Sequence, residues 1–242
     1  MPRTPPRVPR VDVWHDTVDR WREDPDRVRR GLTWLSEAER VRFQRFVHDE
    51  DRWMFLSGRV MARALVGRAL GSEPKSWRWR EGPHGRPEID DPDATLRFNV
   101  AHSAGLVVCA IADGVDVGVD VEDLERRPVG PGFVRRYLSP AEAADVESQP
   151  ADARQERVLT YWTLKESYLK ACGLGVSVPL AEITFSLANG RPGIAFHGSL
   201  AGTAADWTFR LNRPTPRHLM ATAIRGTGLF STDQAFSGTG LP

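Results

Sequence analysis

The chain has 242 residues, of which 40% are hydrophobic and 27% are charged, and its net charge is +1. No apolar run approaches the roughly 18 to 20 residues that cross a bilayer, so the sequence excludes a membrane-spanning helix. The near-neutral balance argues against a general nucleic-acid binder, whose domain is usually strongly basic.

The sequence of the first half predicts strands before and after one long helix. The alternating run "VDVWHD" indicates a strand, and "SEAE" places Ser36 at a helix N-cap with Glu39 three residues on, which is a capping box. Apolar residues at steps of three and four predict an amphipathic helix from Asp51 to Leu70. Strand-like runs separated by loops follow: "SWRWRE", "LRFNVAHS", "GLVVCAIADG" and "VDVGVDVEDL".

The second half predicts the same kinds of element. We expect residues 133–149 to be helical, with "SPAE" as a second N-terminal signature. Residues 151–172 form a long helical pattern that ends at Gly173, a good C-cap residue. Four strand-like runs complete the series: "EITFSL", "GIAFHG", "DWTFRLN" and "HLMATAI".

This order of elements predicts an α+β fold in two halves of similar size. A strand, a long helix and a β-meander precede about Pro128, and helices with a second meander follow it. We expect the halves at residues 11–120 and 121–225. The terminal segments 1–10 and 226–242 are rich in Gly, Pro, Ser and Thr, and we expect both to be flexible tails.

Two carboxylates share one face of a predicted strand. In "GVDVE" the side chains alternate, so Asp120 and Glu122 point the same way, about 6 to 7 Å apart along the backbone. At about 5 Å and an effective dielectric of about 20, like charges cost on the order of 3 kcal/mol. A divalent cation would remove that cost, and the pair indicates a Mg²⁺ site that substrate phosphate completes. An acidic strand end in solvent is the alternative, because this spacing is common by chance.

Lysine is rare in this chain and concentrated in one segment. Only three of the 33 basic residues are lysines, and two of them lie in "YWTLKESYLK". On a helix Trp162, Glu166 and Lys170 share one face, and Lys165 flanks them. An i,i+4 ion pair between Glu166 and Lys170 is worth about 0.3 to 0.5 kcal/mol, and arginine would provide it equally well. A compact charge directed at a phosphate or at a proton in transit explains lysine better.

A third candidate lies at a predicted strand end, where "FNVAHS" places His102 beside Ser103. Both could donate to an anion, and a hydrogen-bonded structural histidine is the alternative. Residues 1–80 hold 18 Lys and Arg against 12 Asp and Glu, which is compatible with a phosphate-rich ligand or an acidic partner, with a solvated surface as the alternative. The ordered set "GRP", "FNVAHS", "GVDVE" and "WTLKESYLK" is far rarer by chance than any of its parts.

This ordered set resembles the 4'-phosphopantetheinyl transferases of the larger surfactin-synthetase-activating (Sfp) type, over roughly residues 35–190. The resemblance implies a monomer of two similar α+β halves related by a pseudo-twofold axis, with the active site in the cleft between them. It implies transfer of 4'-phosphopantetheine from coenzyme A to a serine of an apo carrier protein, acyl or peptidyl, with Mg²⁺ or Mn²⁺ and with release of 3',5'-ADP. A coenzyme A- or nucleotide-binding protein of this fold without transfer activity is the alternative.

The resemblance also implies residue roles. The metal ligands would be Asp120, Glu122 and Glu166. Glu166, directly or through a water on the metal, would be the base for the carrier serine, and Lys170 would neutralise the pyrophosphate, so the catalytic set is Glu166, Lys170 and Asp120. The residues that would hold coenzyme A are Arg42, Arg45, Arg86, His102, Ser103, Lys165 and Lys170.

One position departs from the family pattern, since Ala101 stands where serine is usual. The missing hydroxyl would remove one phosphate contact, worth about 0.5 to 1.5 kcal/mol. The N-terminal "MPRTPPRVPR" does not resemble a secretory signal, and Cys109 and Cys172 are too few for a disulfide framework. We therefore expect a cytoplasmic protein with no nucleic-acid or membrane partner, whose basic cleft edge steers acidic carrier proteins.

Overall fold

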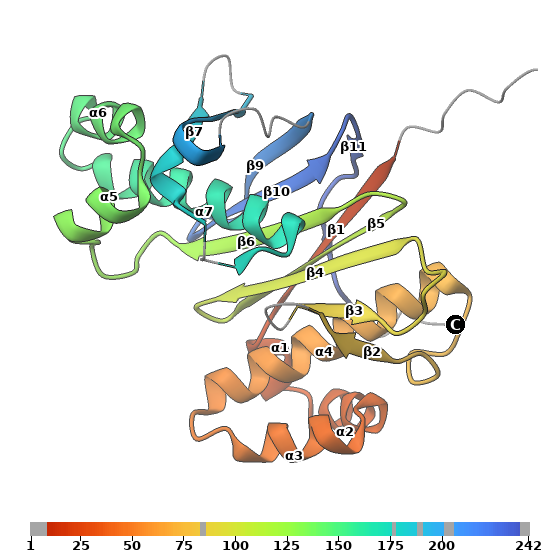
Figure 1. The fold of residues 1–242 in the computed structure, drawn as a ribbon. Coiled ribbons are helices and arrows are strands. Elements are labelled where there is room, and N and C mark those ends of the chain that lie inside the picture. The colour runs from red at the N-terminus through yellow and green to blue at the C-terminus, as the bar shows by residue number, and fades with distance from the viewer. Residues whose placement is uncertain (1–8, 83–85, 176–177, 188–190, 201–205, 238–242) are drawn as a thin grey trace, which may run out of the picture.

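The computed structural model describes residues 9–82, 86–175, 178–187, 191–200 and 206–237, and Figure 1 shows its fold. The first half contains β1 (Arg10–Thr17), α1 (Asp19–Arg22), α2 (Pro25–Trp34), α3 (Glu37–Arg45), α4 (Asp49–Leu70), β2 (Trp79–Glu81), β3 (Pro87–Ile89), β4 (Leu96–Ser103) and β5 (Leu106–Asp113). The second half begins with β6 (Val117–Asp123), α5 (Pro131–Tyr137), α6 (Pro140–Ser148) and α7 (Arg154–Cys172). It continues with the 3-10 turns η3 (Leu180–Glu182) and η5 (Gly198–Leu200) and with β7 (Ile183–Ser186), β8 (Gly193–Phe196), β9 (Trp207–Thr215), β10 (His218–Arg225), β11 (Leu229–Phe230) and β12 (Gln234–Ala235).

Helix ends follow the local sequence signals. The capping box predicted at Ser36 is confirmed, because Ser36 Oγ accepts from the Glu39 amide and the Glu39 carboxylate accepts from the Ser36 amide. Ser139 and Glu142 form the second capping box at the start of α6. Helix α7 ends where Gly173 adopts a left-handed conformation with φ of 68°.

Each half consists of a sheet and one long helix packed on its outer face. One sheet has the order β11-β1-β5-β4, with β12 also paired to β1, and the other has the order β6-β10-β9. Helix α4 packs on β4 and β5, whereas α7 packs on β6 and β10. In Figure 1 the strands β4 and β6 run side by side at the centre, with α4 and α7 on opposite sides of them. The mixed α+β architecture predicted from the order of elements is therefore confirmed.

The central strands are buried on both faces, which explains their nearly unbroken apolar sequences. In β5 the side chains of Val107 and Cys109 face the apolar core formed with helix α4, called the α4 core. Those of Val108 and Ala110 instead belong to a separate apolar cluster, to which both halves contribute. In β6 the valines at 117, 119 and 121 also enter this shared cluster. The positions that alternate with those valines therefore face away from it, toward α7, and they are occupied by Gly118, Asp120 and Glu122.

The division predicted at residue 120 is wrong, because it would cut through a strand. The whole of β6 pairs with β10, from Val117 opposite Ile224 to Asp123 opposite His218. The two sheets therefore divide in the loop between Asp113 and Val117. The edge of a strand is set by its pairing partner, which lies about a hundred residues away in sequence and leaves no local signal.

The C-terminal segment is not a tail over its described residues. Leu229–Phe230 and Gln234–Ala235 both pair parallel with β1, so the end of the second half adds to the sheet of the first. The Phe236 side chain is buried in the α4 core, and its amide donates to the His15 carbonyl at 2.8 Å. Residues 1–8 and 238–242, which belong to the two predicted tails, lie outside the described residues.

Candidate active site between β6 and α7

Glycine at position 118 allows α7 to lie directly on β6. A Cβ atom at Gly118 would come within 2.1 Å of the Ser167 carbonyl oxygen and 2.4 Å of the Ala171 amide nitrogen. Both are backbone atoms of α7, so no side-chain rotation could relieve the clash. The missing side chain thus brings the α7 residues Glu166 and Lys170 next to the carboxylates of β6.

Asp120 and Lys170 form the central contact of this interface. The Lys170 Nζ lies 2.6 Å from Asp120 Oδ1. Burial raises the pKa of Asp120 to about 7, even though Lys170 acts in the opposite direction, and the neighbouring carboxylates Glu122 and Glu166 raise it further. Lys170 is the partly exposed cation that compensates a crowded group of acids.

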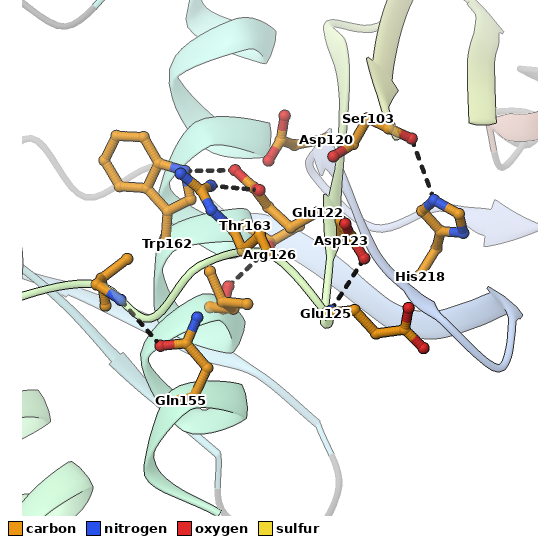
Figure 2. Close-up of polar contacts among 12 residues, drawn as sticks. Ser103, Asp120, Glu122, Asp123, Glu125, Arg126, Gln155, Trp162, Thr163 and His218 are labelled. Carbon is orange, nitrogen blue, oxygen red and sulfur yellow. Dashed lines mark hydrogen bonds and ion pairs between the residues drawn. The ribbon is translucent and has the colours of Figure 1, made fainter. Parts of the chain in front are cut away.

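Glu122 points to the same side of β6 but is held by different partners, as Figure 2 shows. Its carboxylate accepts from the Trp162 indole at 2.8 Å and from the Arg126 guanidinium at 2.7 Å. The Trp162 ring packs in turn against Phe133 and Tyr137 of α5. The predicted shared face of Asp120 and Glu122 is present, and Glu122 is oriented by an aromatic cluster rather than by solvent.

The donor set suits a hard divalent cation, although its oxygens are partly occupied. Oδ2 of Asp120 and Oε1 of Glu166 are buried without a hydrogen-bond partner, which leaves two carboxyl oxygens unsatisfied. Burial also raises the pKa of Glu166. Within the described parts of the chain, no three Asp, Glu, His or Cys side chains are yet placed to bind one ion. Oxygen donors of this kind fit Mg²⁺, provided that Lys170 or Arg126 releases its carboxylate.

A cationic pocket of about 420 Å³ lies between α3, α4 and β4. Arg42, predicted from sequence, lines it together with His102 and Arg59. The Arg59 guanidinium lies 4.3 Å from the Trp79 ring centroid and 5.2 Å from that of Phe55. Partial burial of its ring, followed by the charge of Lys170, lowers the pKa of His102. The strand β4, which carries His102, packs against β6, which carries Asp120, so the pocket and the acidic residues lie on neighbouring strands.

The sequence patterns do not identify Arg59, although its guanidinium packs on two aromatic rings. It lies outside the apolar period that predicts the helix, so no local signal indicates its role. Its closest carboxylate oxygen is Glu39 Oε1 at 3.6 Å, too far for a hydrogen bond. A half-buried guanidinium in this position is available to a bound anion.

Other predicted residues lie elsewhere. Arg45 is exposed and is not part of the pocket lining. The Arg86 guanidinium donates to the Ala171 carbonyl at 2.8 Å, so it caps the end of α7 instead of joining the pocket. Its neighbour Pro87 does line the pocket. The Ser103 carbonyl lies 3.1 Å from Nε2 of His218, a contact between the two halves that Figure 2 also shows.

The prediction that Lys165 lies at the cleft and contacts coenzyme A is wrong. Its side chain is fully buried, with Nζ 2.6 Å from Glu142 and bonded to the carbonyls of Tyr137 and Leu180. Successive residues of a helix point about 100° apart, so Lys165 faces the opposite side from Lys170. Of the two lysines in "YWTLKESYLK", Lys170 therefore lies at the candidate site and Lys165 lies in the core.

Comparison with known proteins is consistent with the division of the chain into two halves between Asp113 and Val117. One family model, described as "4'-phosphopantetheinyl transferase superfamily", matches residues 116–223, and another, "4'-phosphopantetheinyl transferase, N-terminal", matches residues 19–113. The 4'-phosphopantetheinyl transferase HetI of Nostoc sp. is 31% identical over 229 residues, which cover 92% of this chain and 94% of HetI. The 4'-phosphopantetheinyl transferase Sfp of Bacillus subtilis is 31% identical over 159 residues, which cover 65% of this chain and 69% of Sfp.

Among solved structures, the holo-[acyl-carrier-protein] synthase of Thermotoga maritima overlaps 47% of this chain and 64% of its own, with a TM-score of 0.39 and 25% identity. That overlap is too partial to bear on the site.

Proposed function

Since the chain belongs to the 4'-phosphopantetheinyl transferases, we propose that it moves the phosphopantetheine group of coenzyme A to a serine of an apo carrier protein. The observation that carries this proposal is the group of Asp120, Glu166 and Lys170 between β6 and α7, next to a cationic pocket. Acids beside a lysine suit the transfer of a phosphoryl group, where positioning and charge neutralisation supply most of the catalysis.

The pocket of Arg42, Arg59 and His102 would bind the phosphoadenosine end of coenzyme A. Its volume of about 420 Å³ lies in the usual range for a small-ligand site. The Phe55 ring offers an apolar surface beside the cations. His102 of this pocket lies on β4, which packs against β6, so the pyrophosphate would extend from the adenosine site toward Asp120 and Lys170.

The acidic residues would hold Mg²⁺ through Asp120, Glu122 and Glu166. When bound, the ion would supply positive charge that offsets the charge of the pyrophosphate. Lys170 would shift from Asp120 to a phosphate oxygen, a movement that needs only its flexible stem. The Asp120 oxygen that it leaves then becomes free for the cation.

Glu166 is the residue best suited to accept the proton of the carrier serine. Burial raises the pKa of Glu166, which makes its carboxylate a stronger base than an exposed glutamate. The serine oxygen forms a bond to the β-phosphorus of coenzyme A, the bond from that phosphorus to the bridging oxygen breaks, and 3',5'-ADP departs with that oxygen. The serine proton ends on Glu166.

A cationic surface near the site would receive the carrier protein. Arg127, Arg135 and Arg136 are exposed on α5 and the loop before it. In the portion of the chain that the structure covers, none of the three is ion-paired with a carboxylate. Carrier domains with acidic helices would be steered to this surface.

The reaction would take place in the cytoplasm, by a monomer. Cys109 and Cys172 are both free thiols, in keeping with a reducing compartment. None of the helices in the described residues is long and apolar enough to cross a bilayer.

The test is intact-mass spectrometry of an apo peptidyl carrier protein incubated with the protein, coenzyme A and Mg²⁺. We expect the carrier to gain the mass of one phosphopantetheine, and we expect Glu166→Gln to abolish the gain. The matched control is Glu147→Gln, which changes an exposed glutamate on α6 and should leave the gain intact. Tight coenzyme A binding with no transfer to peptidyl or acyl carrier proteins would instead establish a binding protein without transferase activity.

A further inference from the structure

His218, which no motif singles out, bridges the two halves beside the candidate site. It is the first residue of β10, and its ring is buried. Nε2 lies 3.1 Å from the Ser103 carbonyl oxygen and Nδ1 lies 2.7 Å from Thr215 Oγ1. Figure 2 shows the ring directed from the second half toward Ser103.

The two partners determine the state of the ring. A carbonyl oxygen can only accept, so Nε2 of His218 must carry the hydrogen that reaches Ser103. Burial lowers the pKa of His218, which favours the neutral ring. Nδ1 then accepts from the Thr215 hydroxyl, and this contact holds the tautomer in which Nε2 donates.

The Ser103 carbonyl precedes a tight turn that is itself strained. Ser103 pairs with Leu106, and the intervening Ala104 and Gly105 have φ of 42° and 80°. Two positive φ values are the requirement of a type I′ hairpin turn, and alanine is poorly suited to the first of them. Such a conformation persists where its surroundings hold it. Val18 holds the turn from the first half through its amide, 2.9 Å from the Gly105 carbonyl, and His218 holds it from the second.

On its other side, His218 is joined to β6, the strand that carries the acidic residues. His218 lies opposite Asp123 in the β6–β10 ladder, and the Asp123 carboxylate accepts hydrogen bonds from Nε and Nη2 of the neighbouring Arg217. Asp120 and Glu122 lie on the same strand, a few residues away. The hydrogen bond from His218 therefore relates the turn that follows His102 to the sheet of the acids, and a second one, from the Val119 amide to Asn99 Oδ1 at 2.9 Å, joins the middle of β4 to β6.

We propose that His218 is a positioning residue for coenzyme A binding. Its Nε2–H fixes the Ser103 carbonyl and thereby sets the place of His102 and Ser103 relative to Asp120 across the junction of the halves. The inference rests on the proposed function, in which His102 helps to bind coenzyme A and Asp120 helps to hold the metal. His218 itself touches neither the pocket nor the acids.

The test compares variants that differ in the donor at the Nε2 position. Glutamine can place its amide nitrogen near Nε2 of histidine, whereas methionine has a similar length and no donor. Initial rates at varied coenzyme A and saturating carrier, and coenzyme A affinity by calorimetry without carrier, are measured for wild type, His218→Gln and His218→Met. Thermal unfolding of each variant separates a local effect from a loss of fold.

We expect His218→Met to raise KM and Kd for coenzyme A about three- to tenfold, the effect of one hydrogen bond. Its KM for the carrier should stay unchanged, and His218→Gln should recover most of the coenzyme A affinity. Thr215→Val, which frees the tautomer without touching Ser103, should give a smaller increase in the same direction.

Equal coenzyme A affinity in His218→Met and wild type would overturn the positioning role while leaving the transferase intact. An equal defect in His218→Gln and His218→Met, or a loss that tracks thermal stability alone, would also overturn it. A wild-type protein that neither binds coenzyme A nor modifies a carrier would overturn the proposed function, a result that the wild-type arm reveals before any variant is compared.

Discussion

Lys170 of α7 makes its ion pair with Asp120 of β6, at 2.6 Å between Nζ and Oδ1. The pair joins the two elements that carry the other acids, and it leaves Oδ2 of Asp120 without a partner. Because Lys170 contacts only one oxygen of the buried Asp120 carboxyl, the other oxygen can accommodate a second cation.

Lys170→Met should lower kcat/KM for transfer by about 10² to 10³, because a positioned cation is lost where charge develops on the phosphate. Steady-state rates by intact-mass spectrometry measure the effect. Lys170→Arg is the matched control and should restore only a part, since a planar guanidinium cannot occupy the place of a compact ammonium beside Asp120. Wild-type kcat/KM in Lys170→Met would show that this lysine serves the fold alone.

Divalent metal binding should weaken as the pH falls through about 7. Burial raises the pKa of Asp120 to about 7, so below that value the carboxyl is increasingly protonated and a cation must displace the proton. Between pH 8 and pH 6 the ionised fraction falls roughly tenfold, and the affinity for Mn²⁺ should fall by about the same factor. Electron paramagnetic resonance of Mn²⁺, without coenzyme A, measures this. An affinity that is flat over this range would contradict the assignment of Asp120 as a ligand.

Gly118→Ala should destabilise the fold by about 3 kcal/mol or more, because the new Cβ meets backbone atoms of α7 that cannot rotate away. Urea denaturation measures the free energy of unfolding. Gly132→Ala is the matched control: Gly132 lies on the exposed face of α5 with open space around it, so alanine there should be neutral or slightly stabilising. Equal stability of the two variants would contradict the close packing of β6 on α7.

Lys165→Met should lower stability by about 3 to 5 kcal/mol, because it leaves the buried Glu142 without its counter-ion. Its KM for coenzyme A should be that of the wild type, since the side chain faces the core. The double variant Glu142→Gln/Lys165→Met should regain part of the loss, which a double-mutant cycle quantifies. A raised KM for coenzyme A at unchanged stability would instead indicate that Lys165 lies at the cleft.

Phe236→Ala should cost about 3 kcal/mol of stability, because its ring is buried in the α4 core. Thermal and urea unfolding measure the change. Leu229→Ala is the control from the same segment, and it should be close to neutral because the Leu229 side chain is exposed. No effect of Phe236→Ala would mean that the C-terminal segment does not contribute to the fold in solution.

Local sequence patterns determined the elements and the principal motif. Alternation in "GVDVE" placed Asp120 and Glu122 on one face, because a strand has a period of two regardless of its partners. The capping boxes at Ser36 and Ser139 are likewise local, since all their atoms lie within four residues. The helix that carries Glu166 and Lys170 followed from its own period and its terminal glycine.

Tertiary packing decided everything that depends on which side of an element meets a neighbour. The same helix offered Lys165 and Lys170 as equal candidates, and only the position of α6 shows that one of them is buried. The roles of His218 and the C-terminal strands also depend on partners more than a hundred residues away. Sequence patterns report the period of a single element, whereas burial and charge pairing are set by the second element packed against it, and long-range contact has no local signature.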